Sequence, residues 1–531
     1  MKKIRKSLDY CLEYGLKCFF LKLFRRRTYE FGNYEEWINS HKVSVEEANR
    51  QRGCLFAFMP KISIAVPAYE TPENFLREMI ESVQKQTYDN WELCIANGSK
   101  SGKVAKIVKE YSDYDDRIKI QCLENKGIVG NSNCALEMCT GDYIGLLDHD
   151  DVLEVNALYE VADVINKNPK AGLIYSDEDK MSSDSKKFSD PHFKPDYNVD
   201  LLRSNNYICH FCVIRRDVIK KLDGFRAEFE GAQDYDLILR AVEYAEEIVH
   251  IPKILYHWRV HDASTAGNPD SKLFAYEAGK KAIKSHLDRM GIQGTVAHTH
   301  YYGFYHVRYM LKKNPEVLVI IYNIRKTREY RRCKKSVERT AGYKNLSFLA
   351  VNCLSMINTE CLRGKYVLFV DCGIKMITKN WMAEMLALCQ RKDVGAAGVK
   401  IYKPENETIF HAGIILGMDG YAFEGFPREL SGYFHRDELQ QDVSGVTNKF
   451  IMIWGGDLAD IIKEDKRSLL DERAFCSSIR SRNKLVVADL KIECYLKGNV
   501  KKTNWEKYRE KRDPFYNENL VLKKPGYRIC E

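Results

Sequence analysis

From residue 61 onwards, short apolar runs alternate with amphipathic stretches at the spacing of a β-α repeat. Strand-like runs occur at 62–66, 91–96, 118–123, 143–147 and 172–175, and helical apolar spacing occurs between them at 73–86, 104–111, 129–139 and 156–166. Repeated β-α units of this kind predict an α/β fold with a mostly parallel, doubly wound sheet.

The regular pattern weakens after residue 175 and then begins again. Residues 180–200 are polar and are predicted to form a loop, and helices are expected at 234–244 and 268–290. Strand-like runs return at 317–322 and 346–351, and the segment 364–371 repeats the spacing of 141–148: glycine, aromatic residue, apolar strand, aspartate. This echo predicts an internal duplication of the α/β domain.

The expected organisation has four parts, which differ in charge and periodicity. They are a basic helical lead over 1–58, an α/β domain over 59–310, a second α/β domain over 315–500 and a basic, aromatic tail over 501–531.

The most informative segment is the acidic turn that follows the apolar run Tyr143–Leu147. This run reads as a buried strand that leads into Asp148, Asp150 and Asp151. Ligands of open α/β sheets bind beyond the carboxyl ends of such strands. Clustered carboxylates repel one another unless a cation binds them, and Mg²⁺ or Mn²⁺ prefers oxygen ligands and bridges to phosphates. The local alternative is a solvated acidic turn before a helix.

Charge and cysteine content narrow the class of protein. Lys and Arg number 83 against 74 acidic residues, a net charge of +9 that is modest, and no zinc-finger, leucine-zipper or RNA-binding signature accompanies it. Nucleic acid is therefore not an expected partner. The 17 cysteines are mostly scattered singly, which favours a reducing cytosol. The CxxC segment 209–212 has no second pair at zinc spacing and is interpreted as a buried strand.

The N-terminal lead combines helical apolar spacing with many basic residues. Leu8, Leu12, Leu16 and Leu23 recur at helical spacing among lysines and arginines, which favours a helix on an anionic membrane surface. The alternative is a helix that packs on the protein body. No run approaches the ~18 apolar residues of a membrane span, and no signal peptide is recognised.

Several motifs occur in the order and spacing of one known family. They are Val66-Pro67-Ala68-Tyr69-Glu70, the segment 125–133, Asp148-His149-Asp150-Asp151, the segment 175–180, Gln233-Asp234, and Tyr256-His257-Trp258-Arg259 with His261. Together they resemble the family 2 glycosyltransferases of the GT-A fold, and more narrowly the bacterial enzymes that assemble O-antigen or rhamnan polysaccharides. The resemblance is strong over 61–307 and weak over 315–500, where it implies a degenerate second copy.

The resemblance implies transfer with inversion, by a single in-line displacement at the anomeric carbon of the donor sugar. Asp234 is the expected general base, and such a carboxylate contributes roughly 10²–10⁴-fold to the rate. An N-cap of the helix 234–244 is the alternative role for Asp234. Asp236 is expected to pair with Arg240 at i+4.

The resemblance also implies the donor and metal ligands. A Mg²⁺ or Mn²⁺ ion is expected on Asp150 and Asp148, with His257 or His261 as a further ligand or as a donor to a phosphate. Asp148 is also expected to contact the ribose or a metal-bound water. Asp151 is expected to position the donor sugar or to orient the other carboxylates, and Arg259 to pair with the diphosphate. The full set expected to bind the donor is Pro67, Ala68, Tyr69, Glu70, Asn97, Gly127, Asn131, Asn133, Asp148, Asp151 and Arg259.

Two departures from the family pattern limit these expectations. Asn97 replaces the acidic residue that reads the base, so a UDP- or dTDP-sugar remains the expected donor on weaker grounds. In the second copy Asp371-Cys372-Gly373 replaces the acidic motif, and Asp471-Glu472 stands where an acidic pair is expected, so this copy is predicted to be catalytically silent.

The predicted function is metal-dependent extension of a lipid-linked cell-surface polysaccharide. The protein is expected to lie in the cytoplasm, bound peripherally to the inner face of the cytoplasmic membrane, with a glycan or lipid-linked glycan as acceptor. One alternative is a sugar nucleotidyltransferase, although the loop 68–72 lacks the Gly-rich, basic character of that class. The other is a non-catalytic, glycan-binding scaffold protein.

Overall fold

The computed structural model describes residues 33–261, 273–498 and 512–530, which form two compact units. The N-terminal unit comprises Asn33–Tyr197 and Asn205–Tyr305, and the C-terminal unit includes Asn198–Ser204 and His306–Glu531. The predicted membrane-binding helix around Leu8–Leu23 lies outside the described residues. Within the described part of the chain, no helix is both long and apolar enough to cross a membrane.

The N-terminal unit is built on a mixed sheet with the strand order β3-β2-β1-β4-β8-β6-β9-β5, with β7 paired to β6. Strands β1 to β4 are parallel, β8 runs antiparallel to its neighbours β4 and β6, β6 and β9 are parallel, and β5 is antiparallel to β9. The strands are β1 (Ile62–Ala68), β2 (Trp91–Asn97), β3 (Ile118–Cys122), β4 (Tyr143–Leu146), β5 (Val152–Leu153), β6 (Ala171–Ser182), β7 (Phe188–His192), β8 (Cys212–Arg215) and β9 (Glu247–Val260). The carboxyl ends of β1, β2 and β4 therefore meet at one edge of the sheet.

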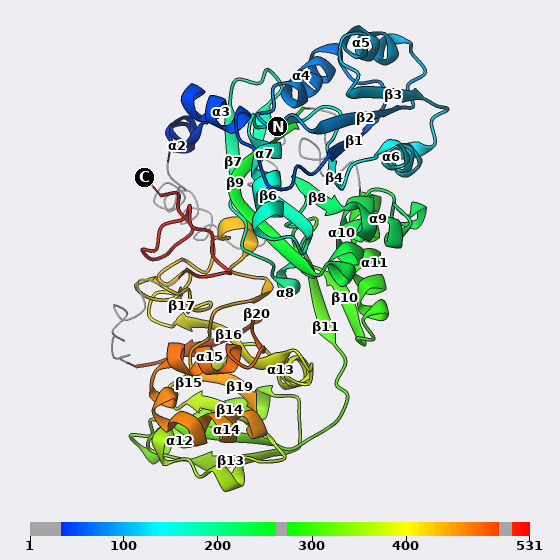
Figure 1. Cartoon of the computed structure of the whole chain (residues 1–531). Coiled ribbons are helices and arrows are strands. Elements are labelled where there is room, and N and C mark those ends of the chain that lie inside the picture. The colour runs from blue at the N-terminus through cyan, green and yellow to red at the C-terminus, as the bar shows by residue number, and fades with distance from the viewer. Residues whose placement is uncertain (1–32, 262–272, 499–511, 531) are drawn as a thin grey trace, which may run out of the picture. The chain divides into compact units, whose positions relative to one another are not determined.

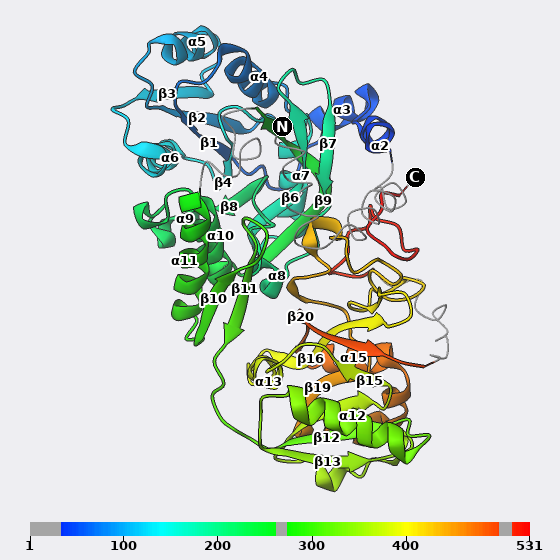
Figure 2. The same ribbon diagram turned by 180° about the vertical axis from the view of Figure 1, so that it is seen from behind.

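Helices cover both faces of this sheet. Helices α4 and α5 lie on one face of strands β1 to β3, and α6 lies on the other (Figure 1, Figure 2). The unit contains α2 (Tyr34–His41), α3 (Val45–Arg52), α4 (Glu73–Gln84), α5 (Lys103–Ser112), α6 (Gly127–Met138), α7 (Ala157–Lys167), α9 (Arg216–Leu222), α10 (Gln233–Tyr244) and α11 (Leu273–Arg289). A separate two-stranded sheet consists of β10 (Gly294–His298) and β11 (Tyr305–Tyr309).

The apolar stripe of α4 shows why the predicted helices form. Leu76, Met79, Ile80 and Val83 recur at helical spacing and are fully buried in the core cluster that also contains the apolar residues of β1 and β2. Burial of one such side chain contributes about 1.5–3 kcal/mol. The fold of this unit is α/β with a mostly parallel sheet, as predicted.

Two local predictions were wrong. The region 180–200 is not one loop, because β6 continues to Ser182, β7 pairs with it, and α8 (Val199–Leu202) follows. The polar residues of the turn between β6 and β7 are mostly exposed, but Lys194 after β7 is buried and contacts Glu178 at 3.3 Å. The CxxC segment is strand only from Cys212 onwards, and Cys209 and His210 precede β8 in a loop.

Among the described residues, the sheet of the C-terminal unit repeats the first sheet without a counterpart of β3 and with β18 added. Its order is β13-β12-β14-β19-β16-β20-β15, with β17 paired to β16 and β18 to β20. The strands are β12 (Val317–Tyr322), β13 (Leu346–Ala350), β14 (Tyr366–Asp371), β15 (Ile374–Met376), β16 (Val394–Lys403), β17 (Thr408–His411), β18 (Gln440–Asp442), β19 (Phe450–Trp454) and β20 (Leu485–Leu496). Helix α12 (Thr327–Thr340) is in front of the sheet in Figure 2 and α14 (Gly455–Asp465) in Figure 1, and α13 (Met382–Cys389) and α15 (Glu472–Arg480) complete the unit.

The order and the direction of the strands in the two sheets correspond along the chain. Strands β12, β13, β14, β15, β16, β17, β19 and β20 take the places of β1, β2, β4, β5, β6, β7, β8 and β9. The register agrees as well, because Ile62 faces Tyr143 in one unit and Val317 faces Tyr366 in the other. This register places Asp371 where the N-terminal unit has Asp148. The correspondence supports the predicted duplication.

Candidate active site

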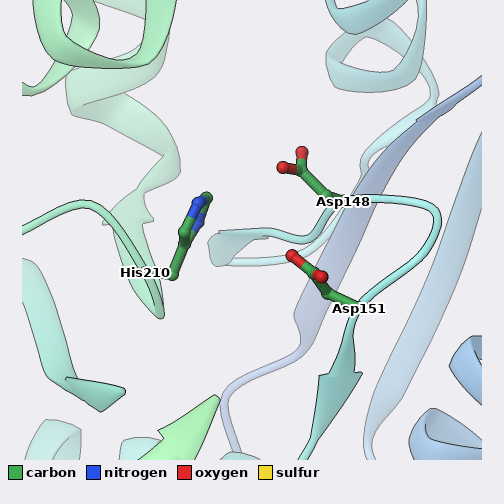
Figure 3. Close-up of side chains that lie close together, drawn as sticks. All are labelled: Asp148, Asp151 and His210. Carbon is green, nitrogen blue, oxygen red and sulfur yellow. The ribbon is translucent and has the colours of Figure 1, made fainter. Parts of the chain in front are cut away.

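Two carboxylates and one imidazole converge beyond the end of β4. Asp148 and Asp151 belong to the acidic turn after β4, and His210 belongs to the loop before β8, the neighbouring strand. One ligand atom from each residue lies within 4.8 Å of the others. Figure 3 shows the three side chains directed toward a common point. The alternative of a solvated acidic turn does not hold for Asp148 and Asp151, because their carboxylates face the His210 imidazole.

Strand β9 holds this cluster in place through Tyr256. Asp151 is 1% exposed, and its Oδ2 accepts a hydrogen bond of 2.5 Å from the Tyr256 hydroxyl. Its Oδ1 accepts one of 2.7 Å from the backbone N–H of Arg259. The ring of His210 stacks on that of Tyr256, with centroids 4.5 Å apart and an interplanar angle of 9°. One tyrosine thus orients both a carboxylate and the imidazole.

The electrostatics of the cluster suit a divalent cation. Burial raises the pKa of Asp151 and of Asp148, and the neighbouring carboxylate of Asp150 raises both further. A cation would offset this cost by stabilising the ionised forms. The Nδ1 atom of His210 is buried and has no hydrogen-bond partner among the described residues. Carboxylate oxygens suit Mg²⁺ and Mn²⁺, and an imidazole ligand favours a transition-metal ion. The residues present therefore fit such an ion.

Asp150 lies beside this cluster and pairs with His261. The Nε2 atom of His261 is 2.8 Å from Oδ2 of Asp150. The Nδ1 atom of His149 lies 3.9 Å from Oδ1 of Asp150 and has no hydrogen-bond partner in the part of the chain that the structure describes. The structure thus brings Asp148 and Asp151 together with His210, and it brings Asp150 together with His261.

His257 and Arg259 do not join the cluster, because side chains alternate along β9. Tyr256 and Trp258 both contact the His210 ring, so the two residues between and after them project from the other side of the strand. There, Nδ1 of His257 lies 2.6 Å from Asp179 Oδ1, and its Nε2 lies 3.3 Å from Glu154 Oε2. Burial by itself lowers the pKa of His257, but these two carboxylates outweigh it and raise the pKa to about 10. Both ring nitrogens of His257 therefore contact carboxylates of the protein in an ion pair, apart from the cluster of Asp148.

Arg259 is fully buried and bound to protein groups. Its Nη2 donates to Glu78 Oε2 at 2.6 Å and its Nη1 to Ser185 Oγ at 2.6 Å, while the guanidinium lies 4.4 Å from the Phe75 ring centroid. Its Nε donates to the backbone carbonyl of Asp150 at 2.6 Å. Arg259 therefore links the backbone of the acidic turn to Glu78 of α4 and stabilises the turn.

Asp234 lies in the first turn of α10 and faces the same region as the cluster. The N-cap of α10 is Ala232, without a side-chain cap, so Asp234 does not have the N-cap role considered as its alternative. Its Oδ2 accepts a hydrogen bond of 2.9 Å from the Asn206 amide, and Cys209 Sγ lies 3.8 Å away. Its charge adds to the rise in the pKa of Asp148, after burial and Asp150.

Asp236, two residues further along α10, pairs with Arg240 at 2.8 Å, as the i+4 spacing predicts.

The residues expected to bind the nucleotide lie at the ends of β1 and β2 and at the start of α6. Pro67 and Ala68 end β1, and Tyr69 beyond them is 45% exposed. Glu70 has a φ of 47°, and its carboxylate accepts hydrogen bonds from the backbone N–H groups of Lys100 and Ser101 at 2.8 and 3.0 Å. Glu70 therefore ties the loop after β2 to the end of β1.

Asn97 and Asn131 shape the adjoining loop. The Oδ1 atom of Asn97 accepts a hydrogen bond of 3.0 Å from Ser99 N–H. Asn131 is 2% exposed and accepts from the Lys126 N–H at 3.1 Å, and a Cβ on Gly98 would approach its Nδ2 to 2.5 Å. Gly98 thus permits the close approach of this loop to α6.

Gly127 and Asn133 serve the same helix. Gly127 starts α6 with a φ of +74°, which favours glycine. Asn133 bonds both backbone groups of Phe225 at 2.8 and 2.9 Å, so it clamps α6 to the chain segment before α10.

Sequence reasoning missed His210, Tyr256 and Asn206 as site residues. The signal available was a histidine inside the CxxC segment, which spacing alone could not pair with carboxylates about 60 residues earlier in the chain. The segment 175–180 supplies the support: Glu178 accepts from the His210 N–H at 3.2 Å, and the fully buried Lys194 donates to the carbonyl of Ile208 at 2.8 Å. The buried strand β6 thus anchors the loop that carries the imidazole.

Part of the chain matches the model of a known family, and several known proteins are similar to it in sequence. Residues 63–223 match the family model described as "Glycosyl transferase family 2". An uncharacterized protein of Sinorhizobium fredii is 35% identical over 74% of this chain and 48% of its own length. An O-antigen biosynthesis protein of Myxococcus xanthus is 30% identical over 79% of this chain and 36% of its own. A chondroitin synthase of Escherichia coli is 29% identical over 48% of this chain and 35% of its own. The chain spans less than half the length of each of these relatives.

Proposed function

This chain carries a family 2 glycosyltransferase domain, and we propose that it transfers one sugar, with inversion, from a nucleoside diphosphate donor to a hydroxyl group of a growing cell-surface polysaccharide. The observation that carries the proposal is the cluster of Asp148, Asp151 and His210 at the carboxyl edge of the sheet, with Asp234 facing it. This edge is where ligands of α/β sheets bind. Sugar transfer requires a positive charge at the donor diphosphate and a base at the acceptor hydroxyl, and these two groups must lie side by side.

Asp234 is the proposed general base. Its Oδ2 is oriented by the Asn206 amide, and the carboxylate accepts the proton of the acceptor hydroxyl. The bond from the acceptor oxygen to the anomeric carbon forms as the bond from that carbon to the diphosphate oxygen breaks. The electron pair leaves with the nucleoside diphosphate. Proton acceptance of this kind contributes roughly 10²–10⁴-fold to the rate.

Asp148, Asp151 and His210 are the proposed ligands of the metal. A bound Mg²⁺ or Mn²⁺ ion would supply positive charge to the leaving diphosphate. The chain's own part is to hold three ligands in a fixed geometry, which it does through Tyr256 and the Arg259 backbone. Asp150 and His261, which contact each other beside the cluster, are a second pair of residues that could supply a metal ligand.

The proposed substrates rest on the family and on the names of the relatives. The Myxococcus relative is named for O-antigen biosynthesis and the Escherichia relative for chondroitin synthesis, which supports a polysaccharide as acceptor. The proposed donor is a UDP- or dTDP-sugar. The proposed location is the cytoplasmic face of the membrane, where the basic lead would bind anionic lipid headgroups and the acceptor would be lipid-linked.

The second copy is proposed to be non-catalytic. Glu472 starts α15, the counterpart of α10, but its carboxylate is buried and bound to Tyr421, Thr447 and Lys449 at 2.6, 2.7 and 3.0 Å. The Lys449 ammonium neutralises it, so it is not available as a base. Ile374 takes the place of Asp151 in the aligned register.

The test is nucleotide release from a panel of UDP-, dTDP- and GDP-sugars, with a crude lipid-linked glycan as acceptor and with Mg²⁺, Mn²⁺ or EDTA. Release from one donor, lost with EDTA and in the Asp148→Asn and Asp234→Asn variants, is the expected result. Asp223→Asn is the matched control, because this exposed aspartate has a φ of 56°, which asparagine also adopts. Absence of release by the folded protein with every donor would favour the scaffold role.

A further inference from the structure

We propose that the C-terminal unit binds a divalent transition-metal ion between His306, Glu384 and Asp489. His306 lies on β11, Glu384 in the first turn of α13 and Asp489 on β20. One ligand atom from each lies within 4.8 Å of the others. Among the described residues, this cluster and that of Asp148 have the same composition, two carboxylates and one histidine. This site is remote in sequence from the residues of the proposed transfer chemistry and has no part in it.

The His306 imidazole stands at a distance that fits a shared ion better than a direct hydrogen bond. His306 is 8% exposed, and its Nε2 has no hydrogen-bond partner in the described part of the chain. The Asp489 Oδ1 atom is 3.6 Å away, beyond hydrogen-bond range. Two ligands bound to one tetrahedral ion at ~2.0–2.2 Å lie roughly 3.4 Å apart.

Three other buried histidines of this protein contact a carboxylate directly. The separations are 2.6 Å for His257 and Asp179, 2.8 Å for His250 and Asp177, and 2.6 Å for His286 and Glu243. His306 is 8% exposed and Asp489 0%, and the two keep about 1 Å more between them than these pairs do. The longer separation leaves room for an ion.

Asp489 is oriented by groups other than His306. It is 0% exposed, and its Oδ1 accepts a hydrogen bond of 3.2 Å from the Lys491 N–H, while its Oδ2 accepts one of 3.1 Å from the Gln440 amide. Each carboxylate oxygen carries two lone pairs, so these contacts leave lone pairs for a metal. Contacts of this kind hold the ligand of a metal site in position.

Glu384 completes the donor set. Its side chain is 26% exposed, and one of its carboxylate oxygens lies within 4.8 Å of the ligand atoms of His306 and Asp489. Arg308 Nε lies 2.9 Å from its Oε1, but the Arg308 side chain is 60% exposed and can turn away into solvent. One imidazole and two carboxylates suit Zn²⁺ or Mn²⁺ and leave one position of a tetrahedral ion open to water. Such an ion would tie β11, α13 and β20 together.

The test measures metal binding by the full-length protein in a background that lacks the first cluster. Asp148→Asn and His210→Gln remove two ligands there, and Co²⁺ absorption spectra with Zn²⁺ and Mn²⁺ content after dialysis report on what remains. The expected result is one ion per chain in this background. Adding His306→Gln should weaken its affinity by at least about 100-fold.

Arg308→Gln is the matched control, because Arg308 contacts Glu384 but supplies no ligand, so binding should persist or tighten. Circular dichroism and the thermal midpoint report whether each variant is folded. If His306→Gln fails to fold, Glu384→Gln also removes one ligand, at a helix position that is 26% exposed, and metal affinity is then compared in that variant. Equal affinity with and without the intact cluster would overturn the proposal and assign these residues to an ion pair. Sugar transfer is not a readout, so the result is independent of the proposed function.

Discussion

Tyr256→Phe isolates the role of one hydroxyl group in the candidate active site. The hydroxyl donates to Asp151 Oδ2 at 2.5 Å and accepts from the backbone N–H of Asp148 at 3.3 Å. Phenylalanine keeps the ring that stacks on His210 but leaves a buried carboxylate oxygen without a donor. Such a loss costs about 1–3 kcal/mol of stability. Because the oxygen belongs to a proposed metal ligand, we expect the apparent metal affinity to fall about 10–100-fold.

The assay is a titration of Mg²⁺ or Mn²⁺ against the rate of nucleotide release, together with urea unfolding. We expect the metal concentration at half-maximal rate to rise by this factor, and most of the rate to return at saturating metal. Tyr175→Phe is the matched control, because its buried hydroxyl donates to the carbonyl of Pro195 at 2.6 Å and touches no acidic residue of the cluster. It should lose similar stability without changing the metal requirement. An unchanged metal requirement in Tyr256→Phe would refute the assignment of Asp151 as a ligand.

Three further outcomes follow from the same structure. Asp234→Asn should lower kcat by roughly 10²–10⁴-fold with little change in the KM for the donor. A raised KM with an unchanged kcat would contradict its role as base. His257 has a folded pKa of about 10, raised above the ordinary 6.5 by Asp179 and Glu154 against the effect of burial, so its contribution to stability is complete below pH 6.5 and is lost as the pH rises toward 10. Urea unfolding across this range should show the decline in the wild-type protein and a smaller one in His257→Gln, and identical slopes would argue against the ion pair. Glu472→Gln should leave the transfer rate unchanged while lowering the free energy of unfolding, since it leaves the Lys449 ammonium without its carboxylate. A loss of activity on this substitution in a folded protein would show that the second copy takes part in transfer.

The strands and helices of both units could be predicted because their signals are local. The runs at 62–66 and 91–96 became β1 and β2 nearly residue for residue, and the stripe of Leu76 and Met79 became the buried face of α4. The echo between 141–148 and 364–371 likewise led to the equivalent strands β4 and β14. Apolar periodicity records which face of each element is buried, and burial is what selects the fold.

The region 180–200 was mispredicted because its burial depends on distant partners. The charged side chain of Lys194 is fully buried. Its contacts, Glu178 and the Ile208 carbonyl, are 16 and 14 residues away in the chain, so the local sequence does not indicate them. A local pattern treats such a segment as solvated. Only the pairing of β6 with β7 supplies the groups that allow the charge to be buried.

By itself, the sequence determined the duplicated α/β architecture, the acidic turn at Asp148 and Asp151, and Asp234 at the start of α10. The tertiary structure decided which side chains meet there. The pleat of β9 turns Tyr256 toward the Asp151 carboxylate and the His210 ring, and it keeps the side chains of His257 and Arg259 out of this cluster. The pairing of β4 with β8 brings His210 across from the carboxylates. The physical reason is that a metal or catalytic site is defined by distances of a few ångströms between strands, and these distances depend on register and pleat rather than on separation along the chain.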